Sequence, residues 1–457
     1  MPKTKKTRKN CKKKKLKKLT VGFEVEFFIL NQKGSVVNKA DLLLSKLEKK
    51  GENKDHSIVK EVGKNMIEVK SHPYENNMES LQTLINNIKT LIYTADENNL
   101  IICPLGSYPS EFKVSTRNEA KYKVQKEIFG SRRFKNSARA CGFHLHFELP
   151  WGVFDYKKLE LKKLINSKNK ESLVNVYNFL IAADPAITTF MQSSPFYQGK
   201  YLGKDSRMIV YRGSQELEYP DALYYNLPQF GALPSYKHTG TDIIRMNKDR
   251  YKEWFKIIKS FKFSKNFYPK YKSKLATNWT PVKVNPHGTL EQRGMDMNHI
   301  SIMFSISVLL RKIISAIQDD HFQVQTSDLA IKEPFKLEKK TILIPPDIYV
   351  KGELQKASAY EGFDNETLLY YCKRILNLAK LLSKRKDNTN FSILEEMIAK
   401  KETVSDQIIK QAKELGHTDL KKKLPPSIAA KIALEHSKRL FKEIVLVEEY
   451  AQELKDN

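Results

Sequence analysis

The chain has 457 residues, of which 40% are hydrophobic and 29% are charged, and its formal net charge is +28. This hydrophobic content suffices for a large core and excludes a wholly disordered protein. Because no stretch approaches about 20 consecutive apolar residues, the sequence predicts no membrane span. The amino terminus lacks the apolar segment of a signal peptide, and the four cysteines form no C-x-x-C pair. A cytoplasmic protein with reduced thiols fits these features best.

Positive charge is concentrated at the start of the chain. Residues 1–19 include eleven Lys or Arg residues and no acidic residue. They show no hydrophobic periodicity, so we expect a disordered basic tail. Residues 1–18 are interpreted either as a solubilising tail, or as a targeting signal or weak contact with nucleic acid or an acidic surface. The rest of the chain is also basic, which favours an anionic ligand, and a nucleotide polyphosphate meets this requirement as well as a nucleic acid does.

Strands and helices are both expected in the first three quarters of the chain. Residues 20–30 place apolar side chains at every second position, which predicts a strand, and residues 79–98 place them at helical spacing, which predicts a long helix. By the same criteria we expect further strands at residues 66–71, 100–105, 142–149, 208–212 and 288–296, and further helices at residues 40–50, 171–183 and 300–319.

The last quarter of the chain is predicted to be helical. Apolar residues recur at intervals of three and four residues over segments 365–383, 403–415 and 427–451, and Pro425 and Pro426 mark the final helix boundary. Strands followed by helices predict an α+β protein. We therefore expect an α+β domain over residues 20–350 and a helical carboxyl-terminal region over residues 351–457 that packs on it.

Four of the predicted strands carry polar side chains on one face. Glu24 and Glu26 are two residues apart, so they project from the same face, about 6.5 Å apart along the strand. Glu68 is a single carboxylate between apolar residues of another strand. The remaining two strands each present three polar side chains together, namely His144, His146 and Glu148, and Thr289, Glu291 and Arg293.

If these strands belong to one sheet, its polar face gathers several carboxylates and two histidines. Burying carboxylates side by side costs free energy unless cations neutralise them. Magnesium is usually held by carboxylates together with substrate phosphates. With Arg293 to stabilise charge on a transferred group, the face is typical of a metal–polyphosphate site. Glutamates on any single strand more often belong to a solvated face, and their recurrence in four strands favours a site.

These motifs, in this order, resemble the carboxylate–amine ligases related to glutamate–cysteine ligase, in the second family of that enzyme. More distantly they resemble glutamine synthetase and the guanidino kinases. The matching segments are residues 21–26 (VGFEVE), 66–69 (MIEV), 71–73 (SHP), 106–110 (GSYPS), 142–146 (GFHLH) and 289–293 (TLEQR), with a further match at residues 401–406 (KETVSD). Apart from that last segment, the resemblance covers residues 20–314.

The resemblance implies a fold and a reaction. The fold is a curved, mainly antiparallel sheet of the glutamine synthetase and guanidino kinase type, with the active site on its concave face and residues 20–350 as the catalytic domain. The implied cofactors are ATP and Mg²⁺, and the implied substrates are a small-molecule carboxylate and an amine, such as amino acids. ATP would phosphorylate the carboxylate, and the amine would then displace phosphate to give an amide.

The same resemblance assigns roles to individual residues. The implied metal ligands are Glu24, Glu26, Glu68, His144 and Glu291. The implied nucleotide contacts are His144, His146 and Arg293. Glu26 and Arg293 are the implied catalytic residues, and Arg293 would touch the transferred phosphoryl group. Arg212 is a further candidate for contact with phosphate or the substrate carboxylate, whereas Arg245 is interpreted as a surface arginine.

Three alternatives stay open at this point. An amidoligase that joins amines to peptide or protein carboxylates shares the Glu-x-Glu and His-x-His features. A metal-dependent hydrolase would use His144 and His146 to bind a transition metal that activates water. A nucleic-acid-binding protein would use the basic tail and aromatic pairs such as Tyr224-Tyr225, although no RNA-binding sheet signature accompanies them. The family commonly has a small residue soon after His146, whereas this chain continues FEL at residues 147–149.

Overall fold

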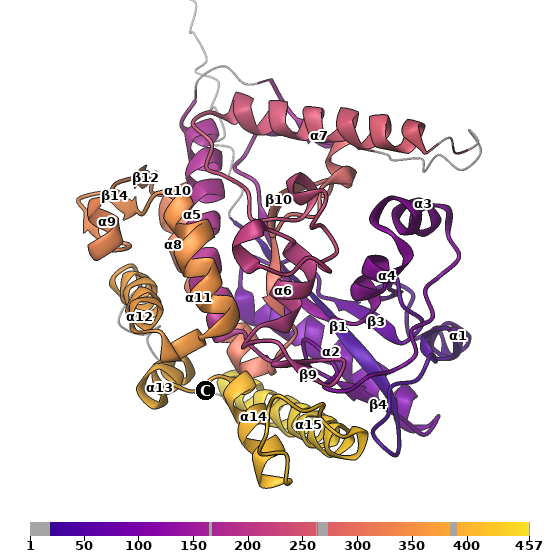
Figure 1. Cartoon of the computed structure of the whole chain (residues 1–457). Coiled ribbons are helices and arrows are strands. Elements are labelled where there is room, and N and C mark those ends of the chain that lie inside the picture. Colours follow the sequence, from indigo (N-terminus) through magenta and orange to yellow (C-terminus); the bar gives the residue numbers. More distant parts are fainter. Residues whose placement is uncertain (1–18, 164–166, 262, 264–272, 384–390, 457) are drawn as a thin grey trace, which may run out of the picture.

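The computed structural model describes residues 19–163, 167–261, 263, 273–383 and 391–456, with side chains as far as residue 447. Figure 1 shows a central sheet with α5, α8 and α12 on one side in this view and α1, α3 and α4 on the other, while α7 crosses the top and α14 and α15 lie below. Of the expected basic tail, residues 1–19, residues 1–18 lie outside the described residues, and Leu19 is buried.

The main sheet has seven strands, and its described pairs are all antiparallel. Its order is β10-β11-β5-β1-β3-β2, and β4 also pairs with β1. These strands are β1 (Val21–Asn31), β2 (Ile58–Lys60), β3 (Met66–Lys70), β4 (Leu100–Cys103), β5 (Gly142–Glu148), β10 (Val282–Asn285) and β11 (Thr289–Asp296). Smaller sheets are formed by β12 (Gln323–Thr326), β14 (Thr341–Ile344) and β13 (Leu337–Glu338), by β6 (Phe154–Asp155) and β7 (Glu160–Leu161), and by β8 (Phe196–Tyr197) and β9 (Lys200–Tyr201).

Helices surround this sheet. Before residue 320 they are α1 (Ala40–Lys50), α2 (Asn77–Asp96), α3 (Ala120–Phe129), α4 (Ser131–Phe134), α5 (Lys168–Phe190), α6 (Ser206–Arg212), α7 (Gly240–Ser260) and α8 (Ile300–Gln318). Later in the chain they are α9 (Leu329–Lys332), α10 (Asp347–Tyr349), α11 (Gln355–Tyr360), α12 (Glu366–Leu381), α13 (Ser392–Lys400), α14 (Val404–Glu414) and α15 (Pro426–Asp456).

Alternation along β1 produces an apolar row that is buried beneath helices. Phe23, Val25 and Phe27 share one side of the strand and are buried, and the ring of Phe23 stacks on that of Phe143 with centroids 6.0 Å apart. Helix α2 packs on β1, β3 and β4, and α8 packs on β5. Burying each such large apolar side chain contributes about 1.5–3 kcal/mol. This packing holds the strands in register, and register decides which polar groups meet on the other face.

The carboxyl-terminal helices share the core of the sheet domain. Helix α12 packs on α5 and α8, α13 packs on α8, and α15 packs on β4 and α8. One cluster of buried apolar side chains extends from Leu19 to Ile444. We therefore propose residues 351–457 as a region packed on the catalytic domain, as expected from the sequence.

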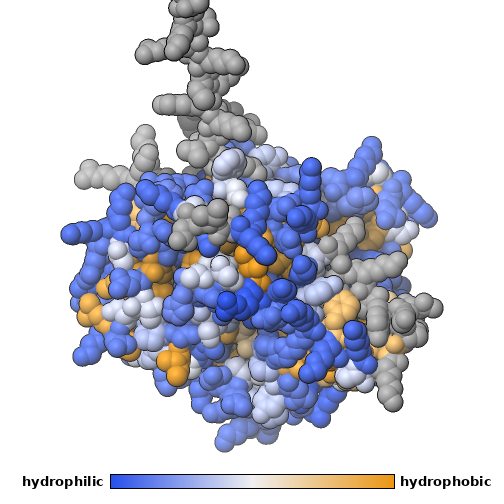
Figure 2. Space-filling view, turned by 90° about the horizontal axis from the view of Figure 1, so that it is seen from above, coloured by the Kyte–Doolittle hydropathy of each residue, from blue (hydrophilic) through white to orange (hydrophobic). Residues whose placement is uncertain are grey.

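Helix α8 is the one described helix that is long and apolar enough to cross a membrane, but 72% of its apolar window is buried inside the fold. It packs against α5, α12, α13 and α15, which is the environment of a core helix. In the space-filling view from above, the surface is mainly hydrophilic, with hydrophobic side chains in small groups between charged ones (Figure 2).

The sequence assigned the wrong secondary structure to residues 208–212. They belong to helix α6, whose first turn is capped by the Asp205 side chain accepting from the Met208 N–H. A short apolar run suits a buried helix as well as a strand, which is why periodicity failed here. Helix α7 and strand β10 were not expected at all. The predicted fold class, α+β with a mainly antiparallel sheet and a helical carboxyl-terminal region, is confirmed.

Candidate active site

Strand pairing brings the four polar rows onto one face. Strands β11, β5, β1 and β3 are consecutive in the main sheet. The directly paired residues are Glu24 with His144, Glu26 with Glu68, and Glu291 with His146. Side chains of directly paired residues project from the same face and are close enough to interact. The groups that the sequence placed on separate strands therefore lie together.

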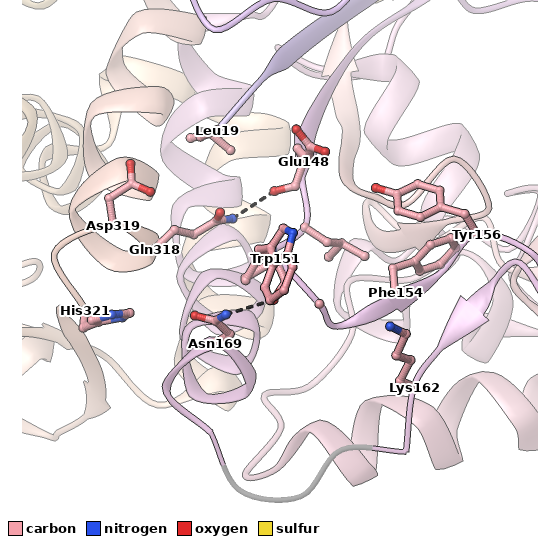
Figure 3. A pocket seen from close by; sticks show the side chains of 13 residues that line it. Leu19, Glu148, Trp151, Phe154, Tyr156, Lys162, Asn169, Gln318, Asp319 and His321 are labelled. Atoms are coloured by element: carbon pink, nitrogen blue, oxygen red, sulfur yellow. Dashed lines mark hydrogen bonds between the residues drawn. The ribbon is translucent and has the colours of Figure 1, made fainter. Parts of the chain in front are cut away.

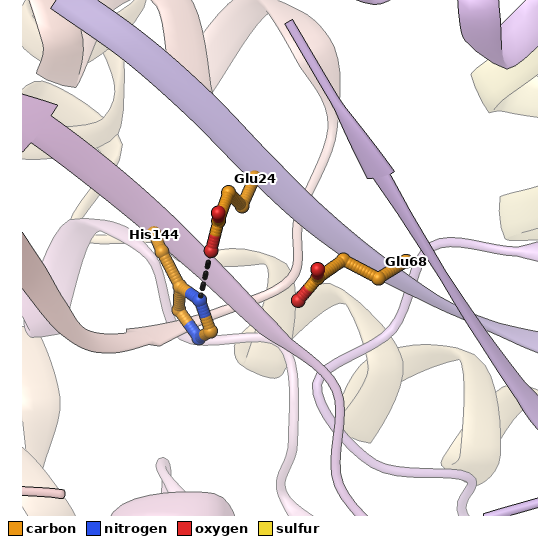
Figure 4. Close-up of side chains that lie close together, drawn as sticks. All are labelled: Glu24, Glu68 and His144. Carbon is orange, nitrogen blue, oxygen red and sulfur yellow. Dashed lines mark hydrogen bonds and ion pairs between the residues drawn. The ribbon is translucent and has the colours of Figure 1, made fainter. Parts of the chain in front are cut away.

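Glu24 is the centre of this cluster. Its Oε2 lies 3.4 Å from His144 Nδ1 and 3.3 Å from His146 Nε2. Figure 4 shows Glu24 joined to His144 across the two strands, with the Glu68 carboxylate approaching from the other side. Burial raises the pKa of Glu24, but the neighbouring His146, His144 and Lys70 outweigh burial and hold that pKa well below its usual range. Glu24 is thus an ionised carboxylate with cationic and hydrogen-bonding neighbours.

Lys70 of β3 is a cation within the cluster that the sequence analysis missed. Its Nζ lies 3.2 Å from Glu24 Oε1 and 2.8 Å from Glu68 Oε1, so it bridges the carboxylates of two strands. Burial lowers the pKa of Lys70, but the charges of Glu68 and Glu24 prevail and raise it. Lys70 follows Glu68 by two residues, so the period of the strand could have placed it on the polar face.

Glu26 lies among carboxylates that outnumber their cations. Its Oε2 accepts a hydrogen bond of 2.6 Å from the Gly142 N–H. Burial raises the pKa of Glu26 to about 7, against the opposing charge of Arg207 and with a further contribution from Glu68. Burial also raises the pKa of Glu61 and that of Glu68, and each is raised further by neighbouring carboxylates. Oxygens of Glu26, Glu61 and Glu68 lie within 4.8 Å of one another, which explains the mutual effect.

Gly142 leaves room for an arginine beside Glu26. A Cβ at this position would collide with the guanidinium of Arg207 and press on the His144 ring. Arg207 reaches this place from helix α6, and its Nη2 donates to the backbone carbonyl of Arg293 at 3.2 Å. Because residues 208–212 were expected to form a strand, no sequence pattern indicated that Arg207 faces the site.

At the end of the face formed by β10 and β11, cationic side chains neutralise the carboxylate of Glu291. Glu291 is buried and pairs with Arg293 of its own strand and with Lys283 Nζ of β10 at 3.4 Å. Burial raises the pKa of Glu291, but Lys283 and Arg293 hold it well below its usual range. The side chain of Arg293 is 24% exposed. Arg293 is therefore oriented by Glu291 while part of its guanidinium stays accessible to a ligand.

The two histidines differ in their protonation. Burial, together with the charge of Arg293, lowers the pKa of His144 to about 4, so His144 is neutral at pH 7. Burial also opposes the charged form of His146, but Glu24 and Glu291 raise its pKa above the usual value. His146 Nδ1 is 2.9 Å from the Thr289 hydroxyl, which orients the ring. His144 can thus offer a lone pair, whereas the surroundings of His146 favour a cation.

The donor set fits a divalent cation. Glu24, Glu68 and His144 offer ligand atoms within 4.8 Å of one another, and Glu24, His146 and Glu291 form a second such group. The Nε2 of His144 is buried without a hydrogen-bond partner in the described part of the chain. The nearby Glu26 Oε1 is 3.8 Å away, which is too long for a hydrogen bond. Oxygen-rich groups of this kind suit Mg²⁺.

Arg212 is placed apart from this cluster. It donates to the Asp184 carboxylate of α5 at 2.5 Å and 3.0 Å, and both residues are buried. Asp184 also accepts from Gln292 at 3.0 Å, and Gln292 projects from the face of β11 opposite to that of Glu291. This position behind the strand gives Arg212 a structural ion pair in place of the predicted contact with phosphate or substrate.

A cavity of about 580 Å³ opens beside the polar face, and Glu24, Lys70, His146 and Glu148 are among the residues that line it. Glu148, the last member of the β5 row, accepts a hydrogen bond of 3.0 Å from the Thr20 hydroxyl. A ligand in this cavity can therefore reach the carboxylate and imidazole groups of the face.

Residues 20–345, well over half of the chain, match the family described as glutamate–cysteine ligase family 2. The chain belongs to this family. Its members are ATP-dependent ligases that form carbon–nitrogen bonds, so the predicted family and the predicted enzyme class are confirmed. No curated protein matches the sequence.

Two solved structures share the fold of this member of glutamate–cysteine ligase family 2. Glutamate–cysteine ligase from Francisella tularensis, in complex with AMP, has a TM-score of 0.53 and 14% identity, and the match covers 95% of each chain. The bifunctional glutathione synthetase from Pasteurella multocida has a TM-score of 0.53 and 12% identity, with 93% of this chain and 53% of that chain covered. The chain thus spans about half the length of the bifunctional enzyme.

Proposed function

We propose that the protein is an ATP- and Mg²⁺-dependent ligase of the glutamate–cysteine ligase type, which joins a small-molecule carboxylate to an amine, such as an amino acid, through an acylphosphate. The observation that carries this proposal is the convergence of the metal-binding groups and Arg293 on one sheet face in a chain of this family. The complex of the Francisella enzyme with AMP supports a nucleotide as a ligand of this protein in addition to the metal.

The reaction needs alignment and charge neutralisation more than acid–base chemistry. A carboxylate is a poor electrophile until phosphorylation gives it a good leaving group. The protein must bring two anions together and stabilise charge on the phosphoryl group as it moves between them. Mg²⁺, which Glu24, Glu26, Glu68, His144 and Glu291 would hold, supplies screening of the phosphates when it is bound.

The residues of the chain supply the remaining charges. Arg293 would contact the transferred phosphoryl group, and its pairing with Glu291 and its partly exposed side chain support this role. His146, with its raised pKa, is suited to a nucleotide phosphate. Glu26 would gain from a bound cation, because burial raises its pKa to about 7.

A metal-dependent hydrolase has less support. Its transition metal would need both imidazoles in one ligand group. In the described residues, each group of potential ligands on this face contains at most one histidine, and glutamates supply the rest. Such oxygen-rich groups favour Mg²⁺ over zinc. An amidoligase acting on peptide or protein carboxylates would use the same chemistry and differs only in its substrate.

The proposal is tested by incubating the protein with ATP, Mg²⁺ and a panel of amino acids, amines and short peptides. We expect ADP and one condensed product, identified by mass spectrometry, and no product without ATP. Glu26→Ala should abolish both while circular dichroism stays unchanged. Condensation on peptide carboxylates alone would favour the amidoligase. Product formed without ATP and stimulated by zinc or manganese would refute a ligase.

We propose the cytoplasm as the location of this reaction, since it supplies ATP and keeps thiols reduced. Cys103, Cys141 and Cys372 are buried free thiols, as such a compartment allows. Contact of residues 1–18 with nucleic acid or an acidic surface remains a separate proposal for the tail.

A further inference from the structure

A second cavity adjoins the one beside the polar face. Its volume is about 600 Å³, and Glu148 and Tyr156 line both cavities. Figure 3 shows Glu148 and Tyr156 together with Trp151 and Phe154 around this second cavity. The two cavities thus adjoin at Glu148 and Tyr156, and together they are called the path from the polar face toward Trp151. A single small amino acid would occupy only part of it, because cavities of this size accommodate drug-sized ligands.

The far end of this path is aromatic. Trp151 is 59% exposed and Tyr156 is 57% exposed, which places them among the most exposed large side chains described. Phe154 meets Tyr156 edge to face, with ring centroids 5.1 Å apart. Exposed aromatic rings in a concave surface next to an active site are typical of a binding site for an apolar group.

Neighbouring residues approach the aromatic segment closely. Gly288, in the turn between β10 and β11, has φ +80°, and a Cβ there would lie 2.8 Å from the Tyr156 ring. The amide of Asn169 donates to the Trp151 backbone carbonyl at 2.8 Å. Gly288 thus combines the left-handed conformation that glycine tolerates with the close approach that Tyr156 needs.

A carboxylate stands where the two cavities meet. Glu148 follows His144 and His146 on the same face of β5, and only 8% of it is exposed. Its Oε2 accepts from the Thr20 hydroxyl at 3.0 Å, and its backbone carbonyl accepts from Gln318 Nε2 at 3.1 Å. An amine substrate arrives as an ammonium ion, and a fixed carboxylate is the partner that it requires.

We propose that this path is the amine site and that the amine carries an aromatic or similarly bulky apolar side chain. The proposal rests on the ligase function proposed above. Glu148 binds the ammonium group, and Trp151 and Tyr156 contact the side chain. The ammonium loses one proton to solvent, its nitrogen forms a bond to the acyl carbon as the bond to phosphate breaks, and the nitrogen then loses a second proton.

Binding is tested first, using tryptophan emission as a readout independent of turnover. Trp254 is buried, whereas Trp151 is exposed, so Trp151→Phe identifies the emission that acrylamide quenches most readily. We expect phenylethylamine to protect that emission and ethylamine to give at least about tenfold weaker protection. Tyr156→Ala should weaken protection, whereas Tyr93→Ala, which removes a ring 54% exposed on α2, should not. Equal protection by both amines, or none by either, would overturn the proposal.

Turnover is then compared with L-phenylalanine, L-cysteine and hydroxylamine as amines and L-glutamate as the first acid. Hydroxylamine is small enough to trap an acylphosphate as a hydroxamate without using the aromatic end. Trp151→Ala should lower kcat/KM for L-phenylalanine about tenfold more than it lowers kcat/KM for hydroxylamine. Hydroxamate formation with no preference for L-phenylalanine over L-cysteine would refute this inference alone. Absence of hydroxamate with every carboxylate of the panel would refute the ligase function itself.

Discussion

The two ends of the polar face differ in how their buried carboxylates are neutralised. At the end formed by β1 and β3, Glu26, Glu61 and Glu68 lie together, and burial and mutual repulsion raise the pKa of each. At the end formed by β10 and β11, Lys283 and Arg293 keep Glu291 ionised. At the first end, the carboxylates outnumber the cations Lys70 and Arg207, whereas at the second end Lys283 and Arg293 outnumber the single carboxylate.

This difference indicates that the two ends bind different ligands. A carboxylate group that is short of cations binds a metal with a gain in free energy, because the ion replaces protons that the carboxylates would otherwise retain. A cation-rich end instead suits an incoming anion such as a phosphoryl group. We therefore expect mutations at the two ends to differ in what they impair.

The largest effect is expected at the cation-rich end. Arg293→Ala should lower turnover about 100- to 1,000-fold, since it removes one preorganised cation from the transferred group. ADP release with saturating Mg²⁺ measures this loss. Arg245→Ala is the matched control, because that side chain is 69% exposed on α7, and its turnover should equal that of the parent. Full activity in Arg293→Ala would remove this end from the mechanism.

A pH effect on stability is expected at the cation-poor end. The folded-state pKa of Glu26, about 7, exceeds its ordinary value of 4.5. Between these two values the unfolded chain releases a proton that the folded chain retains, so the contribution of Glu26 to metal-free stability should fall as pH rises toward 7. At about 1.4 kcal/mol per unit, the loss is on the order of 3 kcal/mol.

Urea unfolding at pH 5, 6 and 7 measures this slope. The neutral, buried His144 contributes a slope of opposite sign, so the variant is compared with the parent. Glu26→Gln should make stability fall less, or rise more, from pH 5 to pH 7, because the amide does not titrate, and Mg²⁺ should have the same effect on the parent protein by replacing the proton. A pH dependence left unchanged by Glu26→Gln would contradict the charge deficit.

A smaller effect is expected from Lys70, which competes with a metal for Glu24 and Glu68. Lys70→Met should tighten Mg²⁺ binding in the absence of nucleotide by about tenfold, because a nearby positive charge disfavours a second one by at least 1 kcal/mol. Calorimetric titration measures this affinity. Lys60→Met, which removes a surface lysine paired with Glu119, is the control and should leave the affinity unchanged. Weaker Mg²⁺ binding in Lys70→Met would show that Lys70 supports the site.

The smallest effect is expected from removing residues 1–18. Both ends of the face lie within the described residues, so turnover should stay within about twofold of the parent. Retention on a nucleic-acid column and location in the cell are the properties expected to change. A collapse of turnover would make the tail part of the catalytic machinery.

Much of this face could be predicted because strand alternation is a local property. The positions of Glu24, Glu26 and His144 followed from the two-residue period of a strand and the assumption that their strands form one sheet. The packing of buried Phe23 on Phe143 fixes the register, and this assumption proved correct. Lys70 follows the same two-residue period, so its position on the polar face could also have been predicted from the sequence.

Other parts depended on tertiary contacts that no local pattern encodes. Arg207 reaches the site from a short helix whose apolar run suits a strand equally well. Arg212 looked available for phosphate, yet Asp184, 28 residues earlier, pairs with it behind the sheet. Lys283 lies on β10, whose alternating sequence VKVN is only four residues long and is therefore too short to be recognised. The cavities beside the face depend on loops, and loop geometry was the least predictable feature.

Gly142 has a consequence for reading related sequences. Its N–H holds Glu26, and its missing side chain leaves the space that the Arg207 guanidinium fills. A homologue with any larger residue at this position would have to displace that guanidinium, even if all the glutamates and histidines were retained. Gly142 is therefore a marker, readable without a structure, for separating relatives with an intact site from relatives that have kept only its motifs.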